Sequence, residues 1–538
     1  MSAKPGFLLG LALSLLPIPA AAQGSIGPLQ QFQAGVFATG SARVGSLAYF
    51  FTVTPTYPPQ PFLTGFVRSD GTFQGTFSID PRGSVTPQGQ AAIRPAGSLG
   101  DLFFFTTALH SSIEDRELWR TDGTSAGTLP VTQDLTLELD VTASEPPVSL
   151  GVPEKNLFFF SASPRPGAPD FELWATDGTP EGTRLIKDVH PGGSSNPRRM
   201  TAFGGFLYFL ADTYASRELW RSDGTPEGTE RVHGFPIGGP GTMDLVQAGA
   251  WLFLIQDNEA GVAVWRTDGT EDGTELELVL PQRLHELQGA GRNLFLVVRD
   301  AAQNNEMWAF DGTTGEAVRV LEIQTNQQIQ LFSVGDSVTF QLEDDHGREP
   351  WWSDGTLEGT RRIDICPGPC SSSVFNISFV GTYGDRAVIR ADDGISGVEP
   401  WLTDGTAAGT WRLGDLCSGD CSSFAIGAQE VNGWLVILGT GGSVTISDGT
   451  PDFAWSAGTV NSNAPIEWVT LPNRIVFANS FTLSGIGLVW SLPVTAPVPL
   501  PGAWMESSRV PGFRFKVQID GQTLSRQEPA CMAQTLCA

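Results

Sequence analysis

Side chains able to do acid–base or metal chemistry are few and scattered in this chain. The sequence contains no Gly-x-Ser-x-Gly nucleophile elbow, no phosphate-binding Walker loop and no His-Glu-x-x-His zinc motif. The adjacent acidic pairs Asp344-Asp345 and Asp392-Asp393 are typical of solvated hairpin tips. The histidines fall in different repeats, and none shows the spacing of a metal-binding pair: His110, His190, His233, His285 and His346. These patterns assign no catalytic, cofactor-binding or metal-ligating residue.

One carboxylate pattern has the residue types of a calcium loop. Asp177 and Glu181 lie in the sequence Asp-Gly-Thr-Pro-Glu-Gly-Thr, and closely spaced oxygen ligands suit Ca²⁺. The Glu position is occupied by Ala126 and Ala408 in two related segments, and the alternating acids of an EF-hand loop are missing. We therefore expect no cofactor, with calcium as the one alternative left open.

The six cysteines form three close pairs, which favours local disulfides. Two of the pairs occupy the same loop of consecutive repeats, 51 residues apart. A metal or redox site stays open as the alternative, although the flanking Pro, Gly and Ser residues do not favour it. Closing such a five-residue loop stabilises the fold by only about 2 kcal/mol. The expected pairs are Cys366–Cys370, Cys417–Cys421 and Cys531–Cys537.

These residues must be positioned by a repeat that fills most of the chain. The tripeptide Asp-Gly-Thr, or a degenerate copy of it, recurs from Asp70 to Asp448 with a mean spacing of about 47 residues. The best copies, at 117–124, 172–179 and 218–225, read Glu-Leu-Trp-x-x-Asp-Gly-Thr. We assign a structural role to the Trp and Asp of six copies: Trp119, Asp122, Trp174, Asp177, Trp220, Asp223, Trp265, Asp268, Trp351, Asp354, Trp401 and Asp404.

Each repeat is predicted to contain four short strands and no helix. In the copy around Trp174 the expected strands are 156–161, 171–176, 184–189 and 198–203, separated by Gly- and Pro-rich turns. Runs such as NLFFF, FLYFL and WLFLI are apolar throughout rather than alternating, so these strands are buried on both faces. Sustained 3.6-residue periodicity, the mark of an amphipathic helix, is missing.

Radially repeated units of four antiparallel strands predict an all-β fold, a β-propeller of about nine to ten blades. A β-sandwich would need alternating outer strands, and a solenoid would need helices or shorter strands. Residues 28–45 are expected to supply outer strands to a blade whose inner strands lie near 473–492, which would close the ring. Two smaller rings in tandem are the rival arrangement.

The repeated turn has the chemistry of a structural element. Its Asp can accept backbone N–H groups two residues on, its Gly adopts positive φ, and its Thr hydroxyl acts like the Asp. The Trp beside it is expected to be buried against a neighbouring blade. On that basis Trp220→Ala is predicted to cost about 3–5 kcal/mol.

The pattern Glu-Leu-Trp-x-x-Asp-Gly-Thr-x-x-Gly-Thr resembles the ELWxxDGT repeat family of secreted bacterial proteins, over roughly residues 45–495. The resemblance implies a β-propeller without established catalytic residues. The chain departs from the family pattern where Pro replaces Leu before Trp351 and Trp401, and where Trp is lost near Asp70 and Asp448.

The chain divides into three parts by composition. Residues 1–22 have the charged, apolar and small-residue regions of a signal peptide, 23–500 form the propeller, and 501–538 form a C-terminal β extension. No apolar run is long enough to span a membrane. A secreted protein, periplasmic, cell-surface or extracellular, agrees with the paired cysteines.

The net charge of −26 argues against nucleic acid as a partner, because such binding depends on many Lys and Arg contacts. We expect a monomeric binding or scaffold protein that presents loops to a protein, a glycan or a cell-surface polymer. A propeller hydrolase or lyase acting on polysaccharide is the alternative, since carboxylates of several blades can converge near the axis of such a ring. The sequence does not identify the ligand.

Overall fold

The computed structural model describes most of the repeat region and three short strands beyond it. The described residues are 27–34, 37–54, 63–79, 91–109, 116–132, 136–137, 149–164, 170–213, 216–236, 241–323, 327–368, 370–372, 379–417, 419–451, 454–459, 466–479, 486–494, 504–506, 514–517 and 524–527. The signal peptide predicted at 1–22, His110 and the pair Cys531/Cys537 lie outside them.

The described strands form ten antiparallel blades, numbered here in chain order. Within each blade the strands pair with their neighbours in the order given. Blade 1 contains β2 (Phe37–Val44), β3 (Leu47–Thr54), β4 (Leu63–Ser69) and β5 (Thr76–Ile79). Blade 2 contains β6 (Ala91–Leu99), β7 (Leu102–Leu109), β8 (Arg116–Thr121) and β9 (Leu129–Pro130).

Blades 3 to 5 follow, and blades 3 and 4 carry two of the three best copies of the repeat. Blade 3 contains β11 (Ser149–Val152), β12 (Leu157–Ser163), β13 (Glu172–Thr176) and β14 (Arg184–Lys187), and β10 (Thr136–Leu137) also pairs with β12. Blade 4 contains β15 (Arg198–Phe203), β16 (Phe206–Asp212), β17 (Ser216–Ser222) and β18 (Glu230–Pro236). Blade 5 contains β19 (Thr242–Ala248), β20 (Trp251–Asn258), β21 (Gly261–Thr267) and β22 (Thr274–Leu280).

Blades 6 to 8 continue the pattern. Blade 6 contains β23 (Arg283–Ala290), β24 (Asn293–Arg299), β25 (Asn305–Asp311) and β26 (Ala317–Ile323). Blade 7 contains β27 (Phe332–Val334), β28 (Ser337–Asp344), β29 (Gly347–Ser353) and β30 (Arg361–Arg362). Blade 8 contains β31 (Phe379–Tyr383), β32 (Arg386–Asp392), β33 (Val398–Thr403) and β34 (Trp411–Arg412).

The last two blades complete the ring. Blade 9 contains β35 (Ala425–Val431), β36 (Trp434–Gly439), β37 (Ser443–Ser447) and β38 (Ala454–Thr459). Blade 10 contains β39 (Ile466–Leu471), β40 (Arg474–Asn479), β41 (Ile486–Pro493) and, at its outer edge, β1 (Gly27–Ala34). The β1–β41 pairing runs from Gly27↔Ser491 to Ala34↔Ile486, so the two ends of the repeat region share one sheet.

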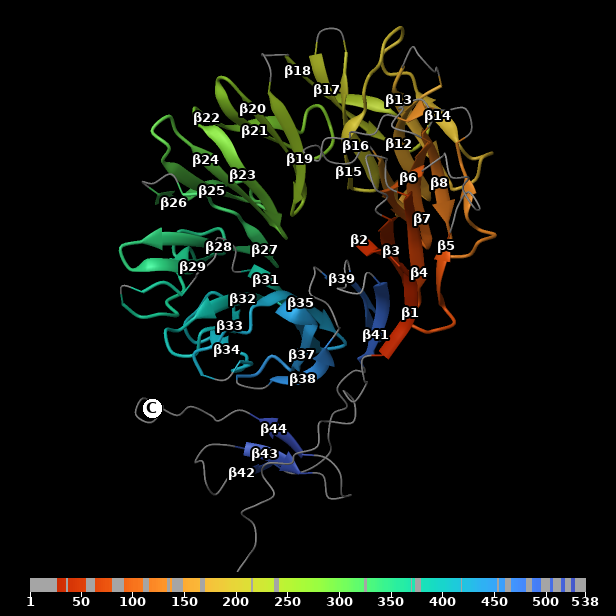
Figure 1. Cartoon of the computed structure of the whole chain (residues 1–538). Coiled ribbons are helices and arrows are strands. Elements are labelled where there is room, and N and C mark those ends of the chain that lie inside the picture. The colour runs from red at the N-terminus through yellow and green to blue at the C-terminus, as the bar shows by residue number, and fades with distance from the viewer. Residues whose placement is uncertain are drawn as a thin grey trace, which may run out of the picture.

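The blades stand around a common axis, with the first strand of each blade innermost (Figure 1). This arrangement confirms the predicted β-propeller as a single ring. Only β1 joins the closing blade, because β2 pairs with β3 and starts blade 1. The segment 198–203 was expected as the fourth strand of the unit around Trp174. It is instead the innermost strand β15 of the next blade, joined to β16 by a Gly204-Gly205 hairpin whose φ angles are +57° and +77°.

The hydrophobic core lies between the blades rather than in one centre. Ten clusters of buried apolar side chains occur among the described residues, and each joins two neighbouring blades. One contains Phe159 of blade 3 and Phe209 of blade 4. Another contains Phe50 of blade 1 and Val476 of blade 10, which closes the ring. β12 is buried at every position, as the apolar run predicts.

Outside the ring, three short strands form a separate antiparallel sheet in the order β42 (Trp504–Glu506), β43 (Arg514–Val517) and β44 (Leu524–Gln527). They fall within the predicted C-terminal extension. Helical structure in the described residues is limited to short 3₁₀ turns, at Pro153–Lys155 and Thr440–Gly442. None of these helices has the length or the apolar character needed to cross a membrane.

Candidate functional site

The repeated turn is a closed network of hydrogen bonds, seen clearly in blade 4. The Asp223 carboxylate accepts the backbone N–H of Thr225 at 2.9 Å and its hydroxyl at 2.7 Å. The Thr225 hydroxyl oxygen in turn accepts the N–H of Gly228 at 2.9 Å. The hydrogen bond from the Thr225 hydroxyl, together with that from its backbone N–H, holds the pKa of Asp223 below its usual value. The same bonds to Asp occur at Asp70, Asp122, Asp177, Asp268, Asp354 and Asp404.

The glycine of each turn lies against the preceding blade. A Cβ atom on Gly224 would stand 2.3 Å from Leu157 Cδ1 of blade 3. The same atom on Gly405 would stand 2.3 Å from the Trp352 ring of blade 7, which is an impossible contact. Both glycines also have φ near +90°, where other residues are strained. The turn is therefore a contact between blades as well as a link between two strands.

Donors of the preceding blade bind the backbone carbonyls of this turn. Arg221 of blade 4 donates from Nη1 to the Gly269 carbonyl of blade 5 at 2.8 Å. Arg361 of blade 7 donates from Nε to the Gly405 carbonyl of blade 8 at 2.6 Å. Related bonds to a Gly or Asp carbonyl of the turn come from Arg184, Asn293, Trp411 and, across the ring closure, Arg474. These donors could not be predicted from local sequence, because the carbonyl that each one binds lies in the next repeat.

The repeated Trp residues lie at the blade interfaces but are less buried than expected. Trp119 is 8% exposed, whereas the rings of Trp174, Trp220, Trp265, Trp351 and Trp401 are half-buried. Each packs against the cluster shared with the preceding blade, as Trp220 does beside residues of blades 3 and 4. The ammonium of Lys187 in blade 3 also lies 5.8 Å from the Trp220 ring centroid. Burial is therefore confirmed for Trp119, whereas the other five rings are only partly buried at the interface.

The glutamate two residues before the Trp has two different roles. In blades 2, 4 and 6 it accepts the indole N–H, as Glu218 does from Trp220 at 3.0 Å. Glu172 of blade 3 is buried and accepts the N–H of Val189 at 2.8 Å, and the N–H and hydroxyl of Ser195 at 2.9 and 2.6 Å. Burial raises the pKa of Glu172, while the bonds from Ser195 and Val189 oppose that rise.

Glu349 of blade 7 and Glu399 of blade 8 accept hydrogen bonds from a following loop in the same way as Glu172. Each of these two loops carries a disulfide. Glu349 is fully buried and accepts the hydroxyl of Ser372 at 2.6 Å. Glu399 accepts the N–H groups of Leu416 and Cys417. The disulfides Cys366–Cys370 and Cys417–Cys421 close these loops as the sequence predicted. The third predicted pair lies outside the described residues.

Charged groups also link the inner strands of neighbouring blades. Arg199 of β15, only 9% exposed, is paired with Asp244 of β19 at 2.6 Å. Ser41 of β2 donates to Glu467 of β39 at 3.0 Å, across the ring closure. Both contacts join blade to blade, so these side chains stabilise the ring.

Two of the scattered histidines lie in strands. His233 of β18 packs against the rings of Phe235 and Trp265, and His285 of β23 lies 2.9 Å from Arg299 Nη2. Burial lowers the pKa of both, with Arg231 adding to the effect at His233 and Arg299 at His285. Each is therefore neutral at physiological pH.

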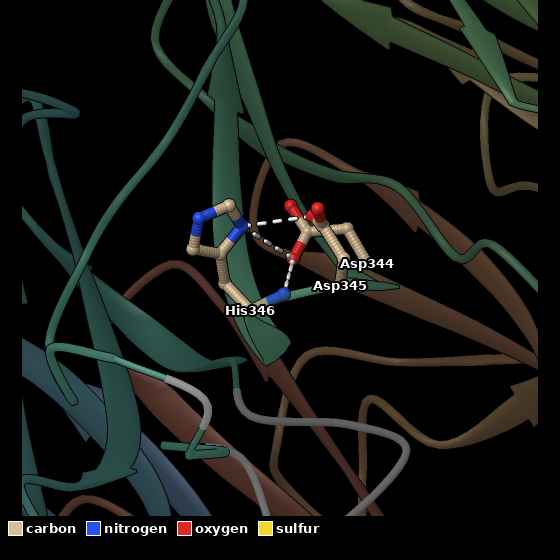
Figure 2. A group of neighbouring side chains, drawn as sticks. All are labelled: Asp344, Asp345 and His346. Atoms are coloured by element: carbon tan, nitrogen blue, oxygen red, sulfur yellow. Dashed lines mark hydrogen bonds and ion pairs between the residues drawn. The ribbon is translucent and has the colours of Figure 1, made fainter.

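Asp344, Asp345 and His346 form the only group of three potential metal ligands among the described residues (Figure 2). They lie at the exposed tip of the β28–β29 hairpin, which agrees with the predicted tip. His346 Nδ1 lies 2.9 Å from Asp345, and the backbone N–H of His346 bonds to Asp344 at 2.8 Å. Asp344 is also paired with Arg362 at 3.1 Å. The three side chains are therefore close together because they hydrogen-bond and pair within the hairpin tip.

Asp177 and Glu181, the residues considered for calcium binding, both lie in the repeated turn of blade 3. One carboxylate oxygen of Asp177 accepts two bonds from Thr179, while Glu181 is exposed. No described group of three ligands includes either residue. Nothing in this geometry tests calcium binding, which stays an alternative to the expectation of no cofactor.

Comparisons with known proteins give weak likenesses of fold. No family model matches the chain, and no curated protein is similar to it. Among solved structures, the β-propeller domain of the Trilobed protease from Pyrococcus furiosus is 11% identical, with a TM-score of 0.32 over 62% of this chain and 96% of that domain. TolB from Acinetobacter baumannii is also 11% identical, with a TM-score of 0.28 over 59% of this chain and 80% of TolB.

A puromycin hydrolase is 15% identical over 70% of this chain, with a TM-score of 0.31. The matched region spans 60% of that hydrolase. Identities and TM-scores this low do not carry the activity of any of these proteins over to this chain.

Proposed function

We propose that this chain is a secreted binding or scaffold protein of the ELWxxDGT repeat type, which recognises a protein or a glycan. The observation that carries the proposal is a division between repeated and non-repeated residues. The Asp carboxylates and Thr hydroxyls of the repeated turn are engaged within the turn, as Asp223 and Thr225 illustrate, and its Gly carbonyls bind donors of the preceding blade, as Gly269 does from Arg221. Recognition therefore falls to residues that differ from blade to blade.

Non-repeated residues stand at exposed hairpin tips and along the inner strands. Ile395, at the β32–β33 hairpin, is 81% exposed beside the Asx turn formed by Asp393. The β28–β29 tip presents Asp344 to His346 instead. Tips of unlike chemistry on one rigid ring form a varied surface, and loops held by a rigid scaffold are common sites of binding.

Secretion is supported by the two disulfides, because such bonds persist in oxidising compartments. The acidic balance of 58 Asp and Glu against 32 Lys and Arg favours partners that are neutral or basic.

Glycan arrays and a reducing-sugar assay on the same purified chain, begun at residue 23, test the proposal together. The expected result is saturable retention of a small set of glycans, or of a protein from the same surface, without release of reducing ends. Catalytic release of reducing ends would overturn it in favour of a polysaccharide hydrolase or lyase.

A further inference from the structure

The outer strand of blade 5 departs from most of the others at the position opposite the Trp of the motif. In blade 4, Trp220 stands opposite Arg231 of the outer strand β18, and Arg231 pairs with Glu218 at 3.3 Å. Three further blades also place an arginine opposite their Trp: Arg319 in blade 6, Arg362 in blade 7 and Arg412 in blade 8.

Blade 5 has neither member of this ion pair. Leu276 of β22 stands opposite Trp265, and Ala263 takes the place of the glutamate. Val279 stands opposite Ala263. Because residues directly opposite in an antiparallel pair share one face, Leu276 and Val279 lie on the face of Trp265, which packs toward blade 4. Leu276 is 47% exposed and Val279 is 57% exposed, so this face presents apolar side chains to solvent.

The backbone of β22 is also free along its outer edge. β22 lies on the outside of the ring (Figure 1), and among the described residues it pairs with β21 alone. An unpaired edge presents N–H and C=O groups that can pair with another strand, and proteins commonly protect such edges with charged side chains. The outer strand β26 of blade 6 is protected in this way, since Arg319 lies 3.3 Å from Glu306 and 3.6 Å from Glu322.

The charges of β22 lie on the opposite face from Leu276 and Val279. Glu275 and Glu277 both pair with Arg266, at 3.1 and 2.6 Å, and Arg266 donates to the Thr314 carbonyl of blade 6. The face toward blade 4 therefore lacks the protection that an ion pair gives to β26.

The surroundings of this edge are acidic. Arg266 is the only basic residue of β21 and β22, and two carboxylates share it. The turn before β22 adds Glu271 and Asp272, which are both exposed. A basic strand is therefore attracted to the edge. A second copy of this chain is not, because full antiparallel overlap of two β22 strands places Glu277 opposite Glu277.

We propose that the outer edge of β22 binds an extended segment of a partner protein in which apolar and basic residues alternate. The backbone of the segment pairs with the free edge, as in other cases of strand addition. Its apolar side chains cover Leu276 and Val279, and its basic side chains lie on the other face beside Glu275, since alternate residues of a strand point to opposite faces. This inference rests on the proposed binding function and names the class of partner for one surface.

The test measures binding of a fluorescein-labelled octapeptide of alternating Val and Lys to the mature chain by fluorescence polarisation. Leu276→Arg introduces the arginine that blades 4, 6, 7 and 8 carry at this position. The matched control is Leu185→Arg in blade 3, because Leu185 also stands opposite its Trp and is 42% exposed. A basic strand is not expected on that outer strand, which carries Arg184 and Lys187.

Saturable binding is expected, weakened at least tenfold by Leu276→Arg and changed less than twofold by Leu185→Arg. Leu276→Gln, which adds no charge, should weaken binding at least threefold through loss of the apolar contact. All three variants are expected to keep the melting temperature of the unmodified chain. A peptide of alternating Val and Glu should bind at least tenfold more weakly than the Val–Lys peptide.

No binding of the Val–Lys peptide, or equal losses in Leu276→Arg and Leu185→Arg, would overturn the site while leaving the proposed function to its own glycan-array test. Equal binding of the Val–Glu peptide would overturn the basic partner. A dimer in analytical ultracentrifugation that Leu276→Arg abolishes would assign the edge to a second copy and overturn the proposal. Failure to retain any glycan, protein or surface polymer would overturn both the site and the proposed function.

Discussion

The docking of each glycine turn on the preceding blade can be tested by adding one methyl group. Gly224→Ala places a Cβ 2.3 Å from Leu157 Cδ1 at a backbone φ of +92°. The left-handed backbone costs about 1–2 kcal/mol for any L side chain. Overpacking against the neighbouring blade adds about 1–3 kcal/mol. The expected loss in free energy of unfolding is therefore about 2–5 kcal/mol, measured by urea denaturation followed by circular dichroism.

Gly419→Ala is the matched control, because its φ is +89° and no atom lies within 4 Å of the added Cβ. It is expected to lose only the backbone contribution, about 1–2 kcal/mol. Leu157→Ala should relieve the clash, so that the double variant with Gly224→Ala loses at least about 1 kcal/mol less than the sum of the single changes. Equal losses for Gly224→Ala and Gly419→Ala, with additive double-variant energies, would refute docking of the turn on the preceding blade.

Three further changes probe the same contacts. Trp220→Ala is expected to cost about 2–3 kcal/mol, less than full burial would imply because the ring is half-buried; calorimetry giving an unchanged melting temperature would contradict the contact with blade 3. Glu172→Ala leaves the Val189 and Ser195 donors without their acceptor and should cost about 2–4 kcal/mol. Faster hydrogen exchange at 189–195 is expected with it, and the partly exposed Glu306→Ala should change stability by less than about 1 kcal/mol. The pKa values of Asp122, Asp223 and Asp268 lie below their unfolded values, chiefly because the Thr hydroxyls donate to the carboxylates. The stability that these three carboxylates contribute is therefore present at neutral pH. It is lost as the pH falls from about 4 through the folded pKa values. Urea midpoints measured from pH 6 to about pH 2.5 should therefore fall, and the three Asp→Asn changes together should flatten the fall; an equal fall in that variant would argue against the turns as its source.

The repeat alone was enough to predict the fold class and the ring. Asp-Gly-Thr recurs because each blade needs the same turn, and wholly apolar strands such as Leu157–Ser163 show burial on both faces. The boundary between successive blades was harder to predict from the sequence. The strand Arg198–Phe203 is joined to its own blade by a hairpin, and the motif does not mark that connection.

Cross-repeat contacts were beyond what the sequence could show. Arg221 binds a carbonyl of the next repeat, and Glu172 binds a loop 17 to 23 residues away, so neither partner is marked by local spacing. One departure from the motif in blade 7 is visible in the sequence. Pro350 replaces the Leu of the motif, but only the strand register reveals that Gln341 stands opposite it.

The central claim is that the first and last strands of the repeat region close one ring. Hydrogen exchange of residues 27–34 in the mature protein tests it most directly, because β1 has backbone partners only if it pairs with β41. We predict slow exchange across this segment, comparable with that of β41 at 486–493. Exchange of residues 27–34 at the rate of an unstructured peptide would contradict the closed ring.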